Sequence, residues 1–407
     1  MKTLTKLSSV ALLGLGLISS ANAVEINVNP YGKLGGIASL DFTNSKQSYG
    51  GVLANAGADF SLTNGLRWGL GAIGAWTPWE QTNNISSPYA SAGDASEAYI
   101  GYKNKLIEFY AGRFKNGFTN FDWLQGNVQG ASIRFTTYES KMIYWLTYAN
   151  SYLYNGKQHN YIQGDRIAAD LTSLTSYNTT GGKKNSMVGG EIIAGGVDFA
   201  YNNFWLKPYV LFNTNAAGTK SILLQGGLKA GISFDISKFK STTIFQAMYQ
   251  YWDLPTLAAN DSASSILLWA DQTFRYQNFL MFGAGIVGIP GNEKSTIYAL
   301  SDSSKFYGRM FASGMSGPLS GFAPYFAGTS LYGYVFGGLD MKWVRVDGMV
   351  SFGTYNEYSI MSNFPVWQQK NMKLSLGVGY AYIKGDFGGG TDNVSGNSLK
   401  AFAKFSY

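Results

Sequence analysis

The sequence predicts an all-β protein, a transmembrane antiparallel β-barrel of 18 strands. Apolar and polar residues alternate with a period of two along most of the chain, which is typical of strands. Charged residues make up 14% of the chain, against about 25% in soluble domains, yet the mean hydropathy is only −0.06. This balance is expected when one face of every strand meets lipid and the other meets water.

The first 23 residues are expected to be a signal peptide. Lys2 and Lys6 supply a positive start, residues 10–19 (VALLGLGLIS) an apolar core, and residues 21–23 (ANA) small residues for cleavage. This apolar core is too short for a spanning helix, which needs about 20 residues. The chain therefore divides into residues 1–23, the signal peptide, and residues 24–407, the barrel.

The strand pattern is clear in the segment VLANAGADFSL, residues 52–62. Its even-numbered positions are apolar, from Val52 to Leu62, whereas Asn55, Asp59 and Ser61 lie on the other face. The tight-turn signal TNG follows at 63–65. The longest apolar run after the signal peptide is FLMFGAGIVGI, residues 279–289, which suits one tilted membrane strand and is too short for a helix.

The connections between strands alternate in length. Short ones are expected at 63–65, 103–105, 139–141, 202–203, 237–240 and 277–278, and long ones at 78–93, 116–128, 151–187, 254–262 and 291–329. Short periplasmic turns and long extracellular loops are the plan of an outer-membrane barrel. About 17 strands can be counted directly, and an even number is required. We expect the missing strand at Lys305–Ser313, giving 18 strands, with 16 as the alternative.

The C-terminal segment SLKAFAKFSY reads as the strand that closes the barrel. Leu399, Ala401, Ala403, Phe405 and Tyr407 share one face, which is expected to contact lipid. Aromatic residues also cluster near other strand ends, as expected at the level of the lipid headgroups. By resemblance to outer-membrane proteins as a class, Phe405 and Tyr407 are the signal read by the barrel-assembly machinery.

A barrel of this size is wide enough for an aqueous channel, so its inward charges are candidate pore-lining residues. The apolar phase of each strand is taken as outward. The basic candidates are then Lys33, Arg67, Arg134, Lys207, Lys229, Arg345, Lys373, Lys400 and Lys404, and the acidic ones Asp59, Glu97, Glu108, Asp271 and Asp347. Because bases outnumber acids, we expect a weak preference for anions.

The segment NGFTNFDWLQGN, residues 116–127, is the candidate constriction loop. It follows a strand on the long-loop side and carries Phe118, Phe121, Asp122 and Trp123. Apolar side chains on a loop require burial, and the lumen offers it. The alternative is packing against a neighbouring loop or subunit.

Other function classes find little support. The one histidine, His159, has Asp165 six residues later in a long polar loop, which is weak ground for catalysis. With no cysteine and one histidine, we expect no metal site and no cofactor. The net charge is +7, but the sequence contains no run of Lys and Arg residues, so nucleic acid is not an expected partner. The motif GLGAIG, residues 69–74, lies inside a strand and opens no helix.

Several segments resemble the Hof-type outer-membrane proteins of Helicobacter. These are the signal ending SSANA, the opening NPYGKLGGIASLDF, the hairpin EAYIGYKNKLIEFYAGRF and the end KAFAKFSY. The Hof type is similar in plan to the OprD-type porins, which have 18 strands and a line of inward basic residues that guides substrate carboxylates. The resemblance implies this role for Arg113, Arg134 and Arg345.

We therefore expect a porin in the outer membrane of a Gram-negative bacterium, through which small polar or anionic solutes diffuse passively. The alternative is a surface adhesin or receptor that uses the loops 151–187 and 291–329. The expected partners are outer-membrane lipid, lipopolysaccharide, the barrel-assembly machinery and small solutes. The sequence leaves open whether the barrel is a monomer or a trimer.

Overall fold

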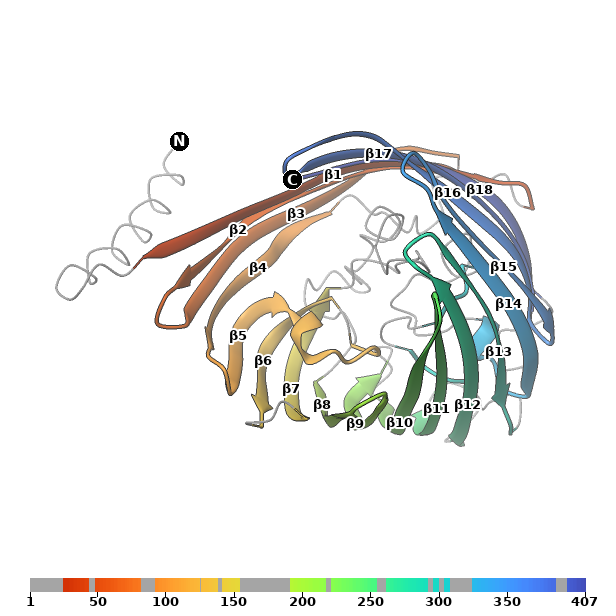
Figure 1. The fold of residues 1–407 in the computed structure, drawn as a ribbon, viewed down its shortest axis with the longest axis horizontal. Helices are drawn as coiled ribbons and strands as arrows, with labels where there is room; N and C mark the ends of the chain where they lie inside the picture. Colours follow the sequence, from red (N-terminus) through yellow and green to blue (C-terminus); the bar gives the residue numbers. More distant parts are fainter. Residues whose placement is uncertain are drawn as a thin grey trace.

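The protein is a closed antiparallel β-barrel of 18 strands (Figure 1), as the computed structural model describes it. Each strand pairs with its neighbours in sequence, and β1 pairs with β18 to close the sheet. The prediction of 18 strands is thus confirmed. The structure describes residues 25–43, 48–81, 92–124, 126–137, 141–153, 191–216, 221–254, 261–291, 296–299, 304–307, 324–385 and 394–407. Within them, no helix is long and apolar enough to cross a membrane.

The strands are mostly longer than the ordinary globular strand of about 5–6 residues. Their bounds are β1 Ile26–Asp41, β2 Tyr49–Leu62, β3 Leu66–Glu80, β4 Ala92–Lys103, β5 Ile107–Lys115, β6 Asn127–Thr136, β7 Met142–Leu153, β8 Ile192–Tyr201, β9 Phe204–Ala216, β10 Ser221–Ile236, β11 Phe239–Leu254, β12 Asp261–Tyr276, β13 Leu280–Ile289, β14 Ser330–Asp340, β15 Arg345–Gly353, β16 Asn356–Gln369, β17 Met372–Gly385 and β18 Val394–Ser406. Two short 3-10 helices, η2 (Asn116–Thr119) and η4 (Pro324–Phe326), lie in the connections.

The outer surface of the barrel is apolar and its interior carries the polar groups. Large apolar side chains such as Leu70, Val210 and Leu331 are exposed on the outside, at 55%, 60% and 61% of their surface. An open sheet in lipid would leave backbone groups unpaired along its edges, and closure removes those edges. Together, the apolar exterior and the closed ladder suit the interior of a bilayer.

The seam between β1 and β18 runs from Lys33–Ser406 to Asp41–Ser398. Tyr407 extends it, because its N–H donates to the Gly32 carbonyl at 3.0 Å and its own carbonyl accepts from the Gly32 N–H at 3.1 Å. The Tyr407 ring lies over Gly32, where an added Cβ would stand 1.9 Å from ring atom Cε1. Tyr407 therefore completes the seam with both its backbone and its side chain.

Two expectations about individual segments are wrong. Lys305–Tyr307 form no strand, and the rest of the expected strand Lys305–Ser313 lies outside the described residues; the 18 strands are complete without it. Also, several aromatic residues near strand ends face inward and are buried, among them Tyr110, Trp145 and Trp252. Adjacent residues of a strand point to opposite faces, so an aromatic pair cannot lie wholly in the lipid.

The alternation is interrupted on β5 at Gly112. This residue has φ of +105°, a left-handed conformation that favours glycine. The two residues after it, Arg113 and Phe114, are both buried, whereas regular alternation would turn one of them outward. Gly112 thus aims the end of β5 into the barrel, just before η2 begins.

Candidate functional site: the barrel lumen

The structure places the predicted charged candidates on the inner face of the wall. On β3, for example, Leu70 is exposed to the outside and Arg67 lies in the opposite phase of the strand. The same relation holds for Lys33, Arg134, Lys207, Lys229, Arg345, Lys373, Lys400 and Lys404 among the bases and for Asp59, Glu97, Glu108, Asp271 and Asp347 among the acids. Arg113, which strand phase alone would turn outward, is buried through the irregularity at Gly112.

Many inward bases are paired with acids. Arg113 contacts Asp94 at 2.9 Å and Arg345 contacts Asp340 at 2.9 Å. Further pairs join Arg134 with Glu108 at 3.9 Å, Lys103 with Glu108 at 3.0 Å, Lys207 with Asp198 at 3.8 Å, and Lys229 with Asp122 of the constriction loop. The acid of each pair weakens the positive potential of its base. The lumen is therefore less positive than the numbers of predicted bases and acids suggest.

Other inward acids accept hydrogen bonds from tyrosines. The Tyr99 hydroxyl donates to Asp59 at 2.6 Å, and the Tyr334 hydroxyl donates to Asp271 at 2.5 Å. Hydrogen bonds to a carboxylate are stronger than those between neutral groups. Tyrosine is therefore a principal partner of the wall carboxylates.

The described residues of the predicted constriction loop, 116–124 and 126–127, lie inside the barrel (Figure 1) and are held at several points. The Arg134 guanidinium donates to the Phe118 carbonyl at 3.0 Å, and Lys229 on β10 pairs with Asp122 of the loop. The Phe121 ring packs 4.8 Å from both Trp145 and Tyr209, measured between ring centroids. These contacts fix the loop against strands β6 to β10.

Parts of the longest connection, 291–329, also lie inside the barrel, which the sequence did not predict. Residues 296–299 are tied to the wall because Gln250 donates to the Thr296 carbonyl at 2.8 Å and accepts from the Tyr298 N–H at 2.9 Å. At 304–307, the Tyr307 hydroxyl donates to Asp347 at 2.5 Å and the Tyr307 N–H donates to Glu357 at 2.7 Å. Wall groups that sequence analysis assigned to the pore therefore anchor a loop.

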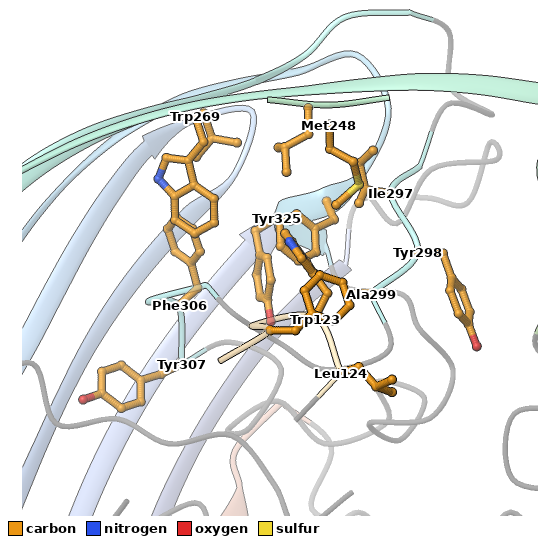
Figure 2. Packing of buried hydrophobic residues seen from close by; sticks show 14 of the residues in the cluster. Trp123, Leu124, Met248, Trp269, Ile297, Tyr298, Ala299, Phe306, Tyr307 and Tyr325 are labelled. Atoms are coloured by element: carbon orange, nitrogen blue, oxygen red, sulfur yellow. The ribbon is translucent and has the colours of Figure 1, made fainter. Parts of the chain in front are cut away.

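An aromatic cluster packs this loop against the wall (Figure 2). Phe306 is fully buried at its centre, with ring centroids of four tyrosines and one tryptophan within 6.5 Å. These neighbours are Trp269, Tyr325, Tyr332, Tyr334 and Tyr355. The cluster reaches the constriction loop, because the Trp123 and Phe326 rings lie 5.7 Å apart. The two loops thus share one apolar core inside the barrel.

Lys305 brings a charge to the edge of this cluster. Its ammonium contacts Asp271 at 2.6 Å and lies 4.3 Å from the Phe336 ring centroid. Burial lowers the pKa of Lys305, and the neighbouring Asp271 carboxylate opposes that shift. Burial also raises the pKa of Tyr355 well above its usual value, and Glu357 adds to the shift. Tyr355 therefore stays a neutral donor to Glu357.

A small pocket lies between the constriction loop and strands β7 to β10. We call it the loop–wall pocket. The loop side is formed by Asn120, Phe121, Asp122 and Trp123, and the wall side by Trp145, Asp198, Lys207, Pro208, Tyr209 and Lys229. Its enclosed volume of about 20 Å³ has room for about one water molecule.

Sequence analysis missed several charged residues of the lumen. Asp198 on β8, Asp94 on β4 and Asp340 on β14 each pair with a predicted base, and Lys305 and Glu357 anchor the inner loop. Strand phase could have found Asp198, because it lies opposite the exposed Ile193 and Tyr201 in the alternation. No local signal could have found Lys305.

Some candidates cannot be placed. His159, Asp165 and residues 154–190 of the predicted adhesive loop lie outside the described residues, as does the signal peptide. The described parts of the loop 291–329 are held inside the barrel. Within the part of the chain that the structure covers, no group of three or more His, Cys, Asp or Glu residues is placed to hold a metal ion.

Solved structures share this fold at low sequence identity. OccAB1 of Acinetobacter baumannii matches with a TM-score of 0.63 and 11% identity, covering 94% of this chain and 96% of that one. The outer membrane protein opdK of Pseudomonas aeruginosa matches with a TM-score of 0.62 and 9% identity, covering 94% and 99%. A structure of OpdK with vanillate matches with a TM-score of 0.62, 10% identity and coverage of 94% and 98%. No protein-family model and no curated protein matches the chain.

Proposed function

We propose that this protein is a porin of the Gram-negative outer membrane, through which small polar or anionic solutes diffuse passively. The observation that carries this proposal is the distribution of polarity in the closed 18-stranded barrel, which is the reverse of that in a soluble protein. Apolar side chains face out and charged side chains face in, so the outside suits lipid and the inside suits water. A barrel of 16 to 18 strands is wide enough to hold an aqueous channel.

The inner loops favour a selective channel over an open pore. The constriction loop and residues 296–299 and 304–307 fill part of the lumen and are fixed by ion pairs and by the aromatic cluster. A similar fold is known in a protein that binds vanillate, a small aromatic carboxylate. This supports small polar or anionic solutes as the permeating class, and the proposal includes no catalytic step.

The relationship to the Hof type, the partners and the assembly signal are also proposals. The Hof-type relationship rests on the resemblance of the sequence segments, whereas the fold supports the OprD-like plan. Lipid, lipopolysaccharide and the barrel-assembly machinery remain the proposed partners, with Phe405 and Tyr407 as the assembly signal. The location of Tyr407 on the outer surface of the seam, 46% exposed, is compatible with its recognition before closure.

Reconstitution into a planar bilayer tests the proposal. The refolded barrel is placed under a salt gradient, and single-channel conductance and reversal potential are recorded. Stable open steps with a reversal potential on the anion side are expected. A folded barrel that conducts nothing would contradict the porin function and direct attention to the external loops.

The anion preference is expected to depend on Arg67. This residue lies on the inner face of β3. Arg67→Glu should move the reversal potential towards the cation side, because an inward charge near the path attracts ions of opposite sign. Lys238→Glu is the matched control, since Lys238 is exposed in the turn between β10 and β11. Equal shifts in both variants would mean that the lumen wall does not set selectivity.

A further inference from the structure

The short turns of the barrel are basic, whereas the long connections are nearly neutral. The eight short turns contain one acid, Glu139, and five lysines, which are Lys105, Lys141, Lys238, Lys342 and Lys370. The connections at the other end of the barrel carry nine bases and eight acids. Positive charge is therefore concentrated at the end of the barrel where the short turns lie. We call these five residues the turn-lysine ring.

The side chains of the turn-lysine ring are available to an external partner. All five are exposed, and Lys105, Lys238, Lys342 and Lys370 make no ion pair with any residue that the structure describes. The Lys141 ammonium lies 6.0 Å from the centroid of the Tyr201 ring, which is itself exposed on the outer surface. The ring thus differs from the lumen wall, where many bases are paired with acids.

Each of the five lysines has a large, exposed aromatic side chain within three residues of it. These companions are Tyr102 for Lys105, Tyr144 for Lys141, Phe239 for Lys238, Trp343 for Lys342 and Trp367 for Lys370. On β4, for example, Tyr102 shares the outward face with Ile100, and Trp343 in the turn between β14 and β15 is 66% exposed. Because aromatic side chains concentrate at the level of the lipid headgroups, the lysines beside them lie at that depth.

The spacing and chemistry of the ring suit separate anionic headgroups. Lysine carries a compact charge on a flexible stem, so it can reach a phosphate without a fixed geometry. Lys342 and Lys370 occupy successive turns, which are two strands apart and hence separated by about 10 Å. Lysines at a membrane surface attract anionic lipids, and the attraction increases with each added charge.

We propose that the turn-lysine ring binds the phosphate headgroups of anionic phospholipids, such as phosphatidylglycerol, in the leaflet that the short turns reach. The lysines attract the headgroup charge, and the aromatic side chains beside them contact the apolar region directly below it. These aromatic companions favour a lipid over an acidic polymer of the cell wall, which offers no apolar phase. The inference rests on the membrane location in the proposed function and not on conduction.

Fluorescence quenching measures the lipid preference at each end of the barrel. Because the chain has no cysteine, Asn371→Cys gives a unique thiol beside Lys370, and Leu331→Cys gives one near the opposite end, at the start of β14. Each protein is labelled with a fluorophore and refolded into phosphatidylcholine vesicles. These vesicles contain a small fraction of nitroxide-labelled phosphatidylglycerol or nitroxide-labelled phosphatidylcholine.

At position 371, phosphatidylglycerol should associate at least about fivefold more strongly than phosphatidylcholine, since each lysine near the surface contributes about this factor. No such preference is expected at position 331. Equal association of the two lipids at position 371 would overturn the proposal, as would the same preference at both positions.

Charge variants assign the preference to the lysines. In the Asn371→Cys protein, the double change Lys342→Gln with Lys370→Gln should remove most of the preference for phosphatidylglycerol. The matched control, Lys342→Arg with Lys370→Arg, keeps both charges and should preserve it. Added salt should weaken the preference in the parent, because exposed charges are screened. A folded glutamine variant, verified by its heat-modifiable mobility, that keeps the full preference contradicts the proposal.

These results separate the lipid partner from the channel. A barrel that shows the lipid preference but never conducts would support the turn-lysine ring and refute the porin function. Conduction without a lipid preference would refute the proposed role of the ring alone. If the barrel instead sediments with purified peptidoglycan through Lys342 and Lys370, and shows no lipid preference, the ring binds the cell wall and the proposal is wrong.

Discussion

Replacing Phe306 by alanine is expected to release the inner loop and increase single-channel conductance several-fold. Phe306 is fully buried at the centre of the aromatic cluster. Truncating a buried phenylalanine to alanine costs about 3–5 kcal/mol. The loop segment 304–307 is also anchored by Lys305 to Asp271 and by Tyr307 to Asp347 and Glu357. A loss of this size should therefore shift the loop away from the wall.

Labelling offers a direct readout of that release. The chain has no cysteine, so Ser304→Cys introduces a unique thiol at a position that is 6% exposed. A membrane-impermeant thiol reagent should label it slowly in the parent barrel and quickly with Phe306→Ala. Phe352→Ala is the matched control, because Phe352 faces outward and is 57% exposed. If the Phe306 change altered neither conductance nor labelling, the cluster would not hold the loop.

Gly112→Ala is expected to lower the stability of the barrel strongly. The residue has φ of +105°, and an added Cβ would stand 2.4 Å from the Ala98 carbonyl oxygen and 3.1 Å from the Tyr99 Cα, both backbone atoms. Left-handed strain for a non-glycine residue costs about 1–3 kcal/mol, and the clash adds to it. The urea midpoint for unfolding from detergent or lipid should fall accordingly.

The control for this change is Gly226→Ala. Nothing lies within 4 Å of a Cβ added at Gly226, so its midpoint should stay near that of the parent. The Gly112 change should also disturb the constriction loop, because Arg113 would lose its place beside Asp94 and η2 follows directly. A midpoint equal to that of Gly226→Ala would mean that β5 adopts another conformation in lipid.

Strand phase predicted the inward charges because alternation is a local property of β geometry. Lys229, for example, lies between Leu228 and Ala230, which must face lipid, so its own direction follows. The number of strands followed from the need for closure and an even count. These features require no knowledge of distant contacts.

Partners inside the lumen could not be predicted in the same way. Lys229 and Asp122 are 107 residues apart, and nothing near either one indicates the other. The strand expected at KFYGRMFAS followed from the odd direct count of strands, and no local pattern indicates that Phe306 is instead buried by other aromatic residues inside the barrel. Arg113 escaped the phase rule because Gly112 breaks the alternation.

The seam between β1 and β18 has a consequence for assembly. Ser39 and Lys400, which meet across it at 2.7 Å, are separated by 361 positions in the chain. Closure therefore joins the two most distant strands, and such long-range pairing is slow. Until it occurs, both edge strands carry unpaired backbone groups that can bind another strand. A peptide copying residues 394–407 should therefore compete for β1, and its addition during refolding is expected to lower the yield of closed barrel, whereas a scrambled peptide should not.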